Sequence, residues 1–346
     1  MSAPEVGGID RASTGKAQSG GPAAGTVLWQ RLVLALMRGA GSALSRISRP
    51  ASVRFGTRLG GLAFRLARRQ RQRADANLRL AYGETLSAPE RLRLARGVFE
   101  HFGRSVVEFL RGPLLSAETL AGLVEVDGWE HVEQALAEKR GVVLVTAHLG
   151  NWEVLGRWLA TVKGLPLTVV AREPENPSFA RYVRGLRENA GFRVLNKGAS
   201  ARELLRVLKR GDAICLLPDQ NSGDVFVPFF GVPAGTVAGP ASLALHTGAA
   251  LIPLFCFQTT QGDFRIVCRP PQPVEASGDH EADVRRIMSG VNAELELAVR
   301  SHPEQWLWLH DRWKSSFETK NRGRAWPVET GFENAYALWR SGRSRA

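Results

Sequence analysis

The stretch VTAHLGNWEVLG, residues 145–156, determines how the rest of the chain is interpreted. A run of apolar, β-forming residues ends at His148, and a helical pattern begins at Asn151. In α/β proteins the carboxyl ends of the strands deliver reactive groups into the crevice where loops leave the sheet. We therefore expect His148 to lie at such an edge, with Gly150 leaving room for a close approach of the backbone.

Glu153 falls in the first turns of the predicted helix. A carboxylate on one ring nitrogen of His148 would fix its tautomer, and the other nitrogen would then be free to take a proton from a substrate hydroxyl. The alternative is a structural histidine beside a carboxylate that suits the helix dipole. No metal is expected, because the HxxxxE spacing differs from HExxH and no third ligand is evident. GxSxG, Walker A and GxGxxG motifs are missing from the sequence, so the expected nucleophile is the substrate, with His148 as general base.

Short apolar runs alternate with helical stretches on both sides of His148. They are GVVLVTAH (141–148), LTVVAR (167–172), FRVLN (192–196), AICLLPDQ (213–220), ALIPLFCFQ (250–258) and FRIVCRPP (264–271). This alternation predicts an α/β fold with a mostly parallel sheet flanked by helices. Residues 255–268 have the pattern of a hairpin, so the sheet is expected to be mixed, and a long helix is predicted over 279–300.

Four regions differ in composition. Residues 1–25 are rich in Gly, Ala and Ser and are expected to be disordered. Residues 26–80 are basic and amphipathic, residues 81–318 form the predicted α/β domain, and residues 319–346 are a polar tail. A helix is predicted over residues 87–111, because Ser87 and Glu90 form a capping-box arrangement at its start. The three cysteines have apolar neighbours and no CxxC spacing, which predicts buried, reduced thiols.

The net charge of +13 is concentrated near the start of the chain, where eleven arginines precede the first acid after Gly25, Asp75. Such a block favours a polyanionic partner: nucleic acid, an anionic bilayer or an acidic carrier protein. Because apolar residues alternate with the arginines, we expect residues 26–80 to lie on a membrane interface. The alternative is a helical hairpin packed on the domain with a solvated basic face. The most apolar stretch, Thr26–Met37, is too short to span a bilayer.

The segment AHLGNWE resembles the HX4(D/E) signature of the glycerolipid-type acyltransferases. Further segments resemble, in the same order, the bacterial lipid A late acyltransferase family over roughly residues 28–314: ANLRLAYGE, AREPEN, LPDQNSGDVFVPFFGVPAGT and PEQWLWLHDRWK. The resemblance implies transfer of a fatty acyl group from acyl-ACP or acyl-CoA to a hydroxyl of a lipid A precursor. It implies an anionic membrane surface and an acyl carrier protein as partners, no cofactor beyond the thioester, and the cytoplasmic face of the bacterial inner membrane.

Two alternatives to this function remain. The acceptor could be another glycolipid, such as a phosphatidylinositol mannoside. A different class is a nucleic-acid-binding protein built on the arginine block, although no nucleic-acid-binding motif is present.

The resemblance also implies roles for single residues. His148 would deprotonate the acceptor hydroxyl, and Glu153 would hold His148. Arg172 would bind a phosphate, with a surface ion pair as the alternative. Asp219 and Gln220 end a predicted strand at the same crevice and would order the site or touch a sugar, unless they only form a turn.

The remaining candidates for substrate binding are Asn151, Phe229, Gly231, Thr236 and Arg312. Phe229 and the neighbouring phenylalanines would line a channel for a fatty chain or belong to the core. Asp311 departs from the family, which more often has a basic residue there. The WLWLHDRWK segment suits a membrane interface, nucleic-acid stacking, or a C-terminal helix docked by its tryptophans.

Overall fold

A computed structural model of the chain describes residues 35, 39, 41–44, 46–171, 174, 176–196, 201–326 and 331–341. The predictions for residues 1–25, and for Thr26–Met37 apart from Ala35, lie outside the described residues. Arg172 lies outside them as well.

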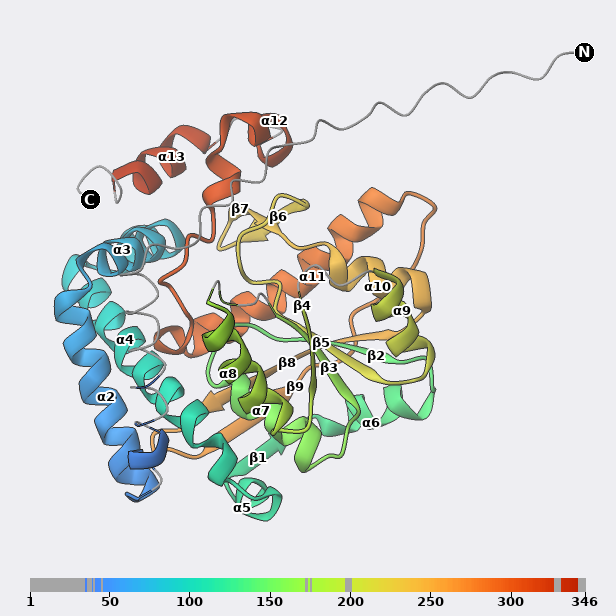
Figure 1. Cartoon of the computed structure of the whole chain (residues 1–346). Coiled ribbons are helices and arrows are strands. Elements are labelled where there is room, and N and C mark those ends of the chain that lie inside the picture. Colours follow the sequence, from blue (N-terminus) through green and yellow to red (C-terminus); the bar gives the residue numbers. More distant parts are fainter. Residues whose placement is uncertain are drawn as a thin grey trace, which may run out of the picture.

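A seven-stranded sheet forms the centre of the molecule (Figure 1). In sheet order its strands are β1 (Val124–Asp127), β9 (Phe264–Cys268), β8 (Ala250–Gln258), β2 (Val142–Val145), β5 (Ala213–Leu216), β3 (Leu167–Ala171) and β4 (Arg193–Asn196). The five strands from β8 to β4 are parallel, whereas β9 pairs antiparallel with β8 and parallel with β1. The predicted mixed, mostly parallel sheet and the predicted hairpin over 255–268 are confirmed.

Helices cover both faces of the sheet, which explains why β2 is apolar at every position. Val142 and Leu144 pack against α7 on one face, while Val143 and Val145 pack against α10 and α11 on the other. The helices are α2 (Arg49–Leu66), α3 (Arg68–Tyr82), α4 (Ala88–Arg111), α5 (Ala117–Gly122), α6 (Trp129–Ala137), α7 (Trp152–Thr161), α8 (Pro177–Glu188), α9 (Ala201–Lys209), α10 (Gly239–Thr247), α11 (His280–Ser301), α12 (Arg322–Ala325) and α13 (Phe332–Ser341). Single 3-10 turns lie at η1 (Gly83–Thr85), η2 (Gly112–Leu114), η3 (Pro303–Gln305), η4 (Lys314–Phe317) and η5 (Thr319–Asn321).

The first three described helices beyond residue 48 lie along one side of the domain (Figure 1). The predicted capping box opens α4, because the Ser87 hydroxyl accepts from the Glu90 amide and the Glu90 carboxylate accepts from the Ser87 amide. Helices α2 and α4 pack backbone to backbone. A Cβ on Gly60 would lie 2.1 Å from the carbonyl oxygen of Phe99, so this contact requires glycine.

The prediction that residues 26–80 associate with a membrane as one segment is wrong for α3. Leu78 is 0% and Leu80 is 6% exposed, because both pack into the core cluster around Trp308. For α3 the alternative of a hairpin packed on the domain therefore holds, and the predicted boundary at residue 80 falls inside this helix. Among the helices that the structure describes, none is long and apolar enough to cross a membrane.

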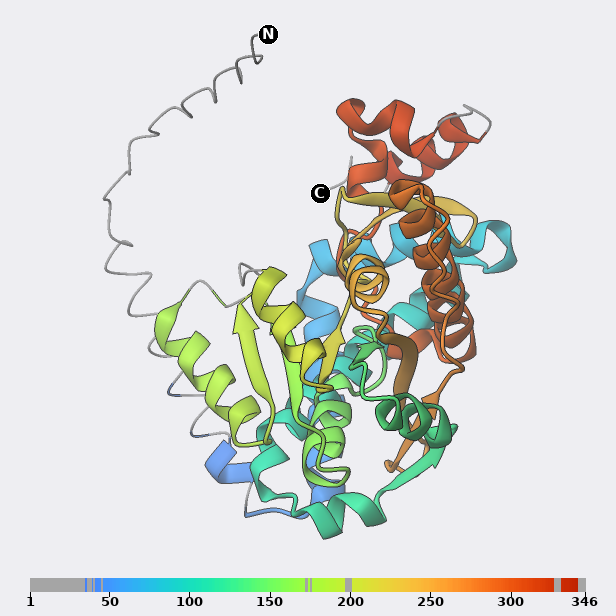
Figure 2. The same ribbon diagram turned by 90° about the vertical axis from the view of Figure 1, so that its right-hand side faces the viewer.

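Within the predicted polar tail, residues 322–325 and 332–341 form helices. Helices α12 and α13 lie at one end of the molecule, beside α3 and a separate antiparallel hairpin of β6 (Val225–Phe229) and β7 (Val232–Thr236) (Figures 1 and 2). Packing of aromatic rings accounts for this order, since Trp339 lies 4.9 Å from Phe317 between ring centroids and Phe332 stacks on Tyr336. These aromatic residues were not recognised in the sequence because most of their neighbours are polar.

Candidate active site

His148 lies three residues beyond the end of β2, at the carboxyl edge of the sheet, as predicted. The adjacent strand β5 is in register with β2, with Val145 opposite Leu216. Asp219 lies three residues beyond Leu216, so the two chains leave the sheet side by side. The His148 Nδ1 is 2.9 Å from Oδ1 of Asp219, which makes this the pair at the centre of the site.

Asp219 is fully buried and accepts hydrogen bonds on both oxygens. Besides the imidazole, the His148 main-chain N–H donates to Oδ2 at 2.9 Å and the Trp306 indole N–H donates to the same atom at 3.0 Å. Burial acts to raise the pKa of Asp219, but the positive field and hydrogen bonds of His148 outweigh it and the pKa is lowered. Asp219 is therefore a carboxylate at neutral pH.

The charge of Asp219 in turn controls His148. Burial acts to lower the pKa of the imidazole, but the charge and hydrogen bond of Asp219 outweigh this effect, so the pKa is raised above 6.5. The side chain of His148 is 21% exposed, whereas that of Asp219 is not exposed at all. With Nδ1 donating to Asp219, Nε2 is the ring nitrogen available to a substrate. Gln220 lies beside it, with its Nε2 3.4 Å from that of His148.

The loop that carries His148 is held by the segment that follows η3. The Gly150 N–H donates to the Gln305 carbonyl and the Leu307 N–H donates to the His148 carbonyl, both at 3.0 Å. Gly150 has a φ of +60°, and a Cβ there would lie 1.9 Å from the Cys256 carbonyl oxygen. The predicted close backbone approach at Gly150 is confirmed, and only glycine fits it.

Glu153 does not hold His148, which corrects the prediction from the HxxxxE spacing. Its carboxylate forms two hydrogen bonds with Arg187 of α8, at 2.6 and 3.2 Å, and accepts from the Trp152 indole at 3.2 Å. Glu153 begins the helix after the loop, and its side chain points toward α8, whereas Asp219 leaves the neighbouring strand directly beside the imidazole. The field of Glu153 still acts on His148 and contributes to its raised pKa.

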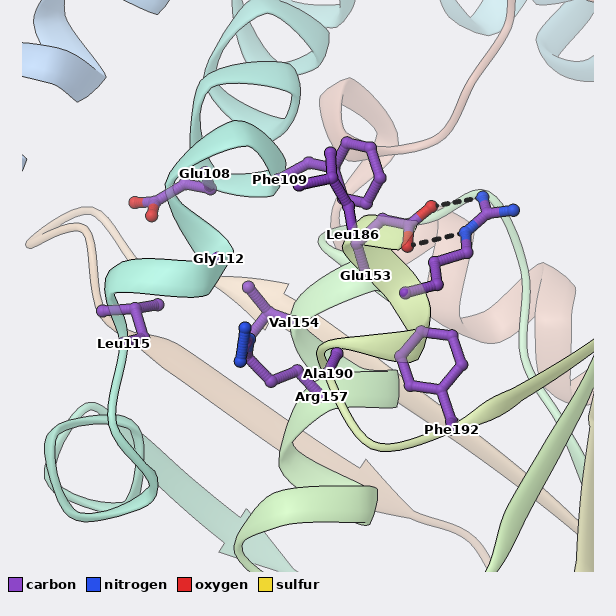
Figure 3. A pocket seen from close by; sticks show the side chains of 11 residues that line it. Glu108, Phe109, Gly112, Leu115, Glu153, Val154, Arg157, Leu186, Ala190 and Phe192 are labelled. Carbon is purple, nitrogen blue, oxygen red and sulfur yellow. Dashed lines mark hydrogen bonds and ion pairs between the residues drawn. The ribbon is translucent and has the colours of Figure 1, made fainter. Parts of the chain in front are cut away.

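A pocket opens on the side of Glu153 that faces α4 and α8 (Figure 3). It is lined by Glu108, Phe109, Gly112, Leu115, Glu153, Val154, Arg157, Leu186, Arg187, Ala190 and Phe192. Figure 3 shows Phe109, Leu186 and Phe192 around this space, with dashed lines marking the pair of Glu153 with Arg187. Arg157 is buried, and burial lowers the pKa of its guanidinium. Apolar residues make up most of the pocket lining, and Glu108, Glu153, Arg157 and Arg187 are its charged members.

Asn151 is the predicted binding residue that lies closest to His148 in the chain, and its role is structural. It is buried, and its side-chain oxygen accepts from the Val154 N–H at 3.1 Å, which caps α7.

Four other predicted binding residues lie away from the surface of the site. Phe229, Gly231 and Thr236 belong to the β6–β7 hairpin, and Arg312 forms hydrogen bonds with it. Phe229 is fully buried among Trp306 and Trp313, so it is core and lines no channel. Gly231 lies in the exposed turn between the strands. The buried Arg312 donates to the Gly235 carbonyl at 2.6 Å and to the Thr236 hydroxyl at 2.7 Å. Arg312 and Thr236 are hydrogen-bonded to each other and both are buried, so the prediction that they bind substrate is wrong.

Sequence reasoning missed three residues that surround the central pair: Trp306, His310 and Arg187. The His310 Nε2 lies 3.2 Å from the Asp219 carbonyl oxygen, and burial lowers its pKa to about 4, so it is neutral. The tryptophans of WLWLHDRWK were predicted to face a membrane, nucleic acid or the domain as part of a helix. Instead, residues 306–313 are not helical and Trp306 is 0% exposed. The signal available in the sequence was the high density of tryptophan and histidine in residues 306–314, which is typical of a buried functional segment.

The arrangement agrees with comparisons to known proteins. The family model of bacterial lipid A biosynthesis acyltransferases matches residues 28–315. The lipid A biosynthesis lauroyltransferase of Escherichia coli is 29% identical over 77% of this chain and 86% of its own length. The palmitoleoyltransferase of lipid A biosynthesis from the same organism is 27% identical over 75% and 84%. The phosphatidylinositol mannoside acyltransferase of Mycobacterium tuberculosis is 30% identical over 65% and 72%.

The matched region contains the whole site, from the helix α4 that supports the His148 loop to the segment that contacts Asp219. The chain belongs to the bacterial lipid A biosynthesis acyltransferase family and is an acyltransferase.

Proposed function

We propose that the protein transfers a fatty acyl group from a thioester, acyl-ACP or acyl-CoA, to a hydroxyl of a glycolipid, with a lipid A precursor as the first candidate acceptor. One observation carries this proposal. His148 has Nδ1 hydrogen-bonded to a buried carboxylate, its side chain is 21% exposed, and its Nε2 lies beside the exposed Gln220. This is the arrangement of a general base that must take a proton from an alcohol near neutral pH.

In the proposed reaction, Nε2 of His148 removes the proton of the acceptor hydroxyl while the oxygen attacks the thioester carbonyl carbon. A carbon–oxygen bond forms, and collapse of the tetrahedral intermediate breaks the carbon–sulfur bond. The thiolate then takes the proton from the imidazolium, so the enzyme returns to its starting state. Asp219 stabilises the imidazolium between these two transfers because it remains ionised throughout.

Glu153 and Arg187 form the next layer of the proposed site. Their ion pair is mostly buried, with side-chain exposures of 14% and 20%, and it forms part of the pocket lining. We assign the pair an electrostatic role, in which Glu153 supports protonation of His148 at a distance. The apolar residues that line the same pocket, such as Phe109 and Leu186, offer a surface for part of the acyl chain.

The protein would act at the cytoplasmic face of the inner membrane, where a carrier-protein or CoA thioester meets a membrane glycolipid. A second acceptor, a phosphatidylinositol mannoside, is supported by the relative of that name at 30% identity. Lipid extracts from a deletion strain would separate the two, because the lipid that loses one acyl chain identifies the acceptor. Membership in an enzyme family leaves the nucleic-acid-binding alternative without support.

The experiment that tests the reaction is acyl transfer by a His148→Ala variant. Purified protein is supplied with a labelled acyl thioester and a tetra-acylated lipid A precursor, and the product is identified by mass spectrometry. We expect kcat to fall by about 10²–10⁴-fold, the range for loss of a general base. Full activity in a folded His148→Ala protein would refute the proposed role.

A further inference from the structure

Helix α2 carries a row of large apolar side chains that face solvent. They are Phe55, Leu59, Leu62 and Leu66, which are 51%, 47%, 49% and 75% exposed. Their spacing of four, three and four residues places them on one side of an α-helix, and we call this row the α2 stripe. Single exposed leucines are ordinary on protein surfaces, but an apolar row of this length marks an interaction surface.

The stripe cannot turn inward, because a different side of α2 is fixed against α4. That packing side is made of small buried residues, Ser52, Gly56 and Gly60. A Cβ on Gly56 would lie 2.6 Å from the Gly103 carbonyl oxygen, so the two backbones are in close contact. Figure 1 shows α2 at the outer edge of the molecule with α4 on its inner side. The α2 stripe therefore lies beside the contact between α2 and α4 and remains exposed to solvent.

Arginines border the stripe on the side away from α4. By helical geometry Arg54, Arg58 and Arg65 fall between about 70° and 110° from the centre of the stripe, and all three are exposed. Helix α2 contains no acidic residue, and α3 continues the charge with the exposed Arg68 and Arg69. Around the axis, α2 thus presents a packing side, then the apolar stripe, then a purely basic side.

We propose that the α2 stripe docks the protein on an anionic bilayer, with its apolar side chains at the acyl boundary and the bordering arginines at the lipid phosphates. This order of faces is that of a helix lying in a membrane interface. An acidic carrier protein would engage the arginines and leave four large apolar side chains in water, so the bilayer is the favoured partner. The proposal deepens the proposed function, because it names the surface through which the enzyme reaches a membrane acceptor.

Docking at α2 would also place the site near the lipid surface. On the side of α4 toward the sheet, His101 Nε2 lies 2.9 Å from the Gly150 carbonyl, two residues beyond His148. Ser105 donates to the same carbonyl at 3.4 Å. One helix therefore separates the α2 stripe from the loop of the catalytic base, and the base is rigidly connected to the docked surface.

The first experiment measures flotation of the full-length protein with vesicles containing phosphatidylglycerol. A Leu59→Gln and Leu62→Gln double variant is compared with Leu114→Gln and Leu297→Gln, which are 49% and 58% exposed outside α2. We expect the stripe variant to bind at least about tenfold more weakly, since half of each leucine side chain remains to be buried. The control should bind as the wild type does. Equal binding by all three proteins overturns the proposal.

The second experiment tests the charge. Arg54→Gln, Arg58→Gln and Arg65→Gln are combined and compared with a variant in which the three exposed basic residues of α9, Arg202, Arg206 and Lys209, become Gln. Near an anionic surface each arginine contributes a factor of about five, so the α2 variant should lose roughly 100-fold in vesicle binding and the α9 variant little. Equal losses would indicate net charge alone and overturn the proposal.

Two further readouts separate this proposal from its rivals. Transfer to a detergent-dispersed acceptor should be unchanged in the stripe variant, and His148→Ala should float normally, so failure of docking and failure of the catalytic proposal are distinguishable. If the α2 arginine variant shows only a higher KM for acyl-ACP and normal flotation, the surface serves the carrier protein and the bilayer proposal is refuted.

Discussion

Asp219→Asn is the substitution that best tests the site, because it preserves the shape of the side chain and changes its hydrogen bonds. Oδ2 of Asp219 accepts from two N–H groups, the His148 main chain and the Trp306 indole. An asparagine must place its amide oxygen there, so its NH2 group faces Nδ1 of His148. That nitrogen then has to accept, and the ring proton moves to Nε2, the nitrogen that should receive a proton from the substrate.

The expected cost follows from this change of tautomer. The same exchange beside a catalytic histidine in a serine-protease triad lowers kcat by about 10⁴. We expect a 10³–10⁴-fold fall in kcat for Asp219→Asn, which corresponds to about 4–5.5 kcal/mol of transition-state stabilisation. KM should change little, because Asp219 is fully buried and does not reach the substrate.

The pH dependence of kcat/KM supplies a second signature. His148 acts as a base only when neutral, so the rate should rise as pH passes through its pKa, which lies above 6.5 in the wild type. Without the Asp219 charge, the largest influence that raises the pKa of His148 is lost, and burial, which lowers it, outweighs the remaining field of Glu153. The acid limb of the profile should therefore move to lower pH while the plateau falls.

Initial rates of thiol release from the acyl donor, measured from pH 5 to 9 with a lipid acceptor, would show both effects. Asp224→Asn is the matched control, since Asp224 is an exposed acid in the same turn that accepts from Ser222 and Ala238. A plateau rate within tenfold of the wild type for Asp219→Asn, or an acid limb that does not move, would refute the assignment of this carboxylate.

Three other substitutions probe the surroundings of the central pair. Glu153→Gln weakens the pair with Arg187 and removes a charge that raises the pKa of His148, so kcat should fall by about tenfold, far less than for Asp219→Asn. Trp306→Phe keeps the packing but removes one donor to Asp219, and we expect a kcat about tenfold lower at unchanged KM. Arg312→Met breaks two buried charged hydrogen bonds and should lower the free energy of unfolding by about 2–4 kcal/mol in urea titrations, with KM for the glycolipid within twofold.

Each of these three predictions can be refuted by a specific result. A loss for Glu153→Gln as large as that for Asp219→Asn would restore the sequence-based assignment of Glu153 to His148. For the indole, Trp308→Phe is the matched control, because Trp308 donates to the Pro303 carbonyl and not to Asp219. Equal kinetics for both tryptophan variants would assign a purely structural role to Trp306. A tenfold rise in KM at unchanged stability would return Arg312 to substrate binding.

The sequence was sufficient to locate His148 but not to identify its partner. A buried apolar run followed by a helix start places the histidine at the edge of the sheet, and this inference needs only local pattern. The partner depends on strand order. Asp219 reaches Nδ1 because β5 lies next to β2 with Val145 opposite Leu216, whereas Glu153 was chosen because it is near in the chain. Neighbours across a parallel sheet cannot be read from spacing.

Burial produced the other differences between sequence and structure. Arg312 was expected to bind substrate because of the family resemblance, and charged side chains are seldom fully buried. Here the guanidinium is accommodated by the Gly235 carbonyl, the Thr236 hydroxyl and the face of Phe229. These partners belong to a hairpin far from Arg312 in the sequence, so no local pattern announces them. The burial of Leu78 and Leu80 was missed for a similar reason. An amphipathic basic helix has the same sequence pattern whether its apolar side contacts a membrane or the protein core.

The His148 loop and the segment Gln305–Leu307 form one unit, which explains why the catalytic domain extends so far toward the C-terminus. Two main-chain hydrogen bonds join the loop to this segment, and the Trp306 indole reaches past the loop to the carboxylate that orients the base. The base, its carboxylate and the indole thus come from three parts of the chain separated by more than 70 residues each. A shift of this segment that breaks one of these hydrogen bonds would displace both His148 and Asp219. The orientation of the base is therefore a property of the complete fold, and the short signature around His148 supplies only the reacting group.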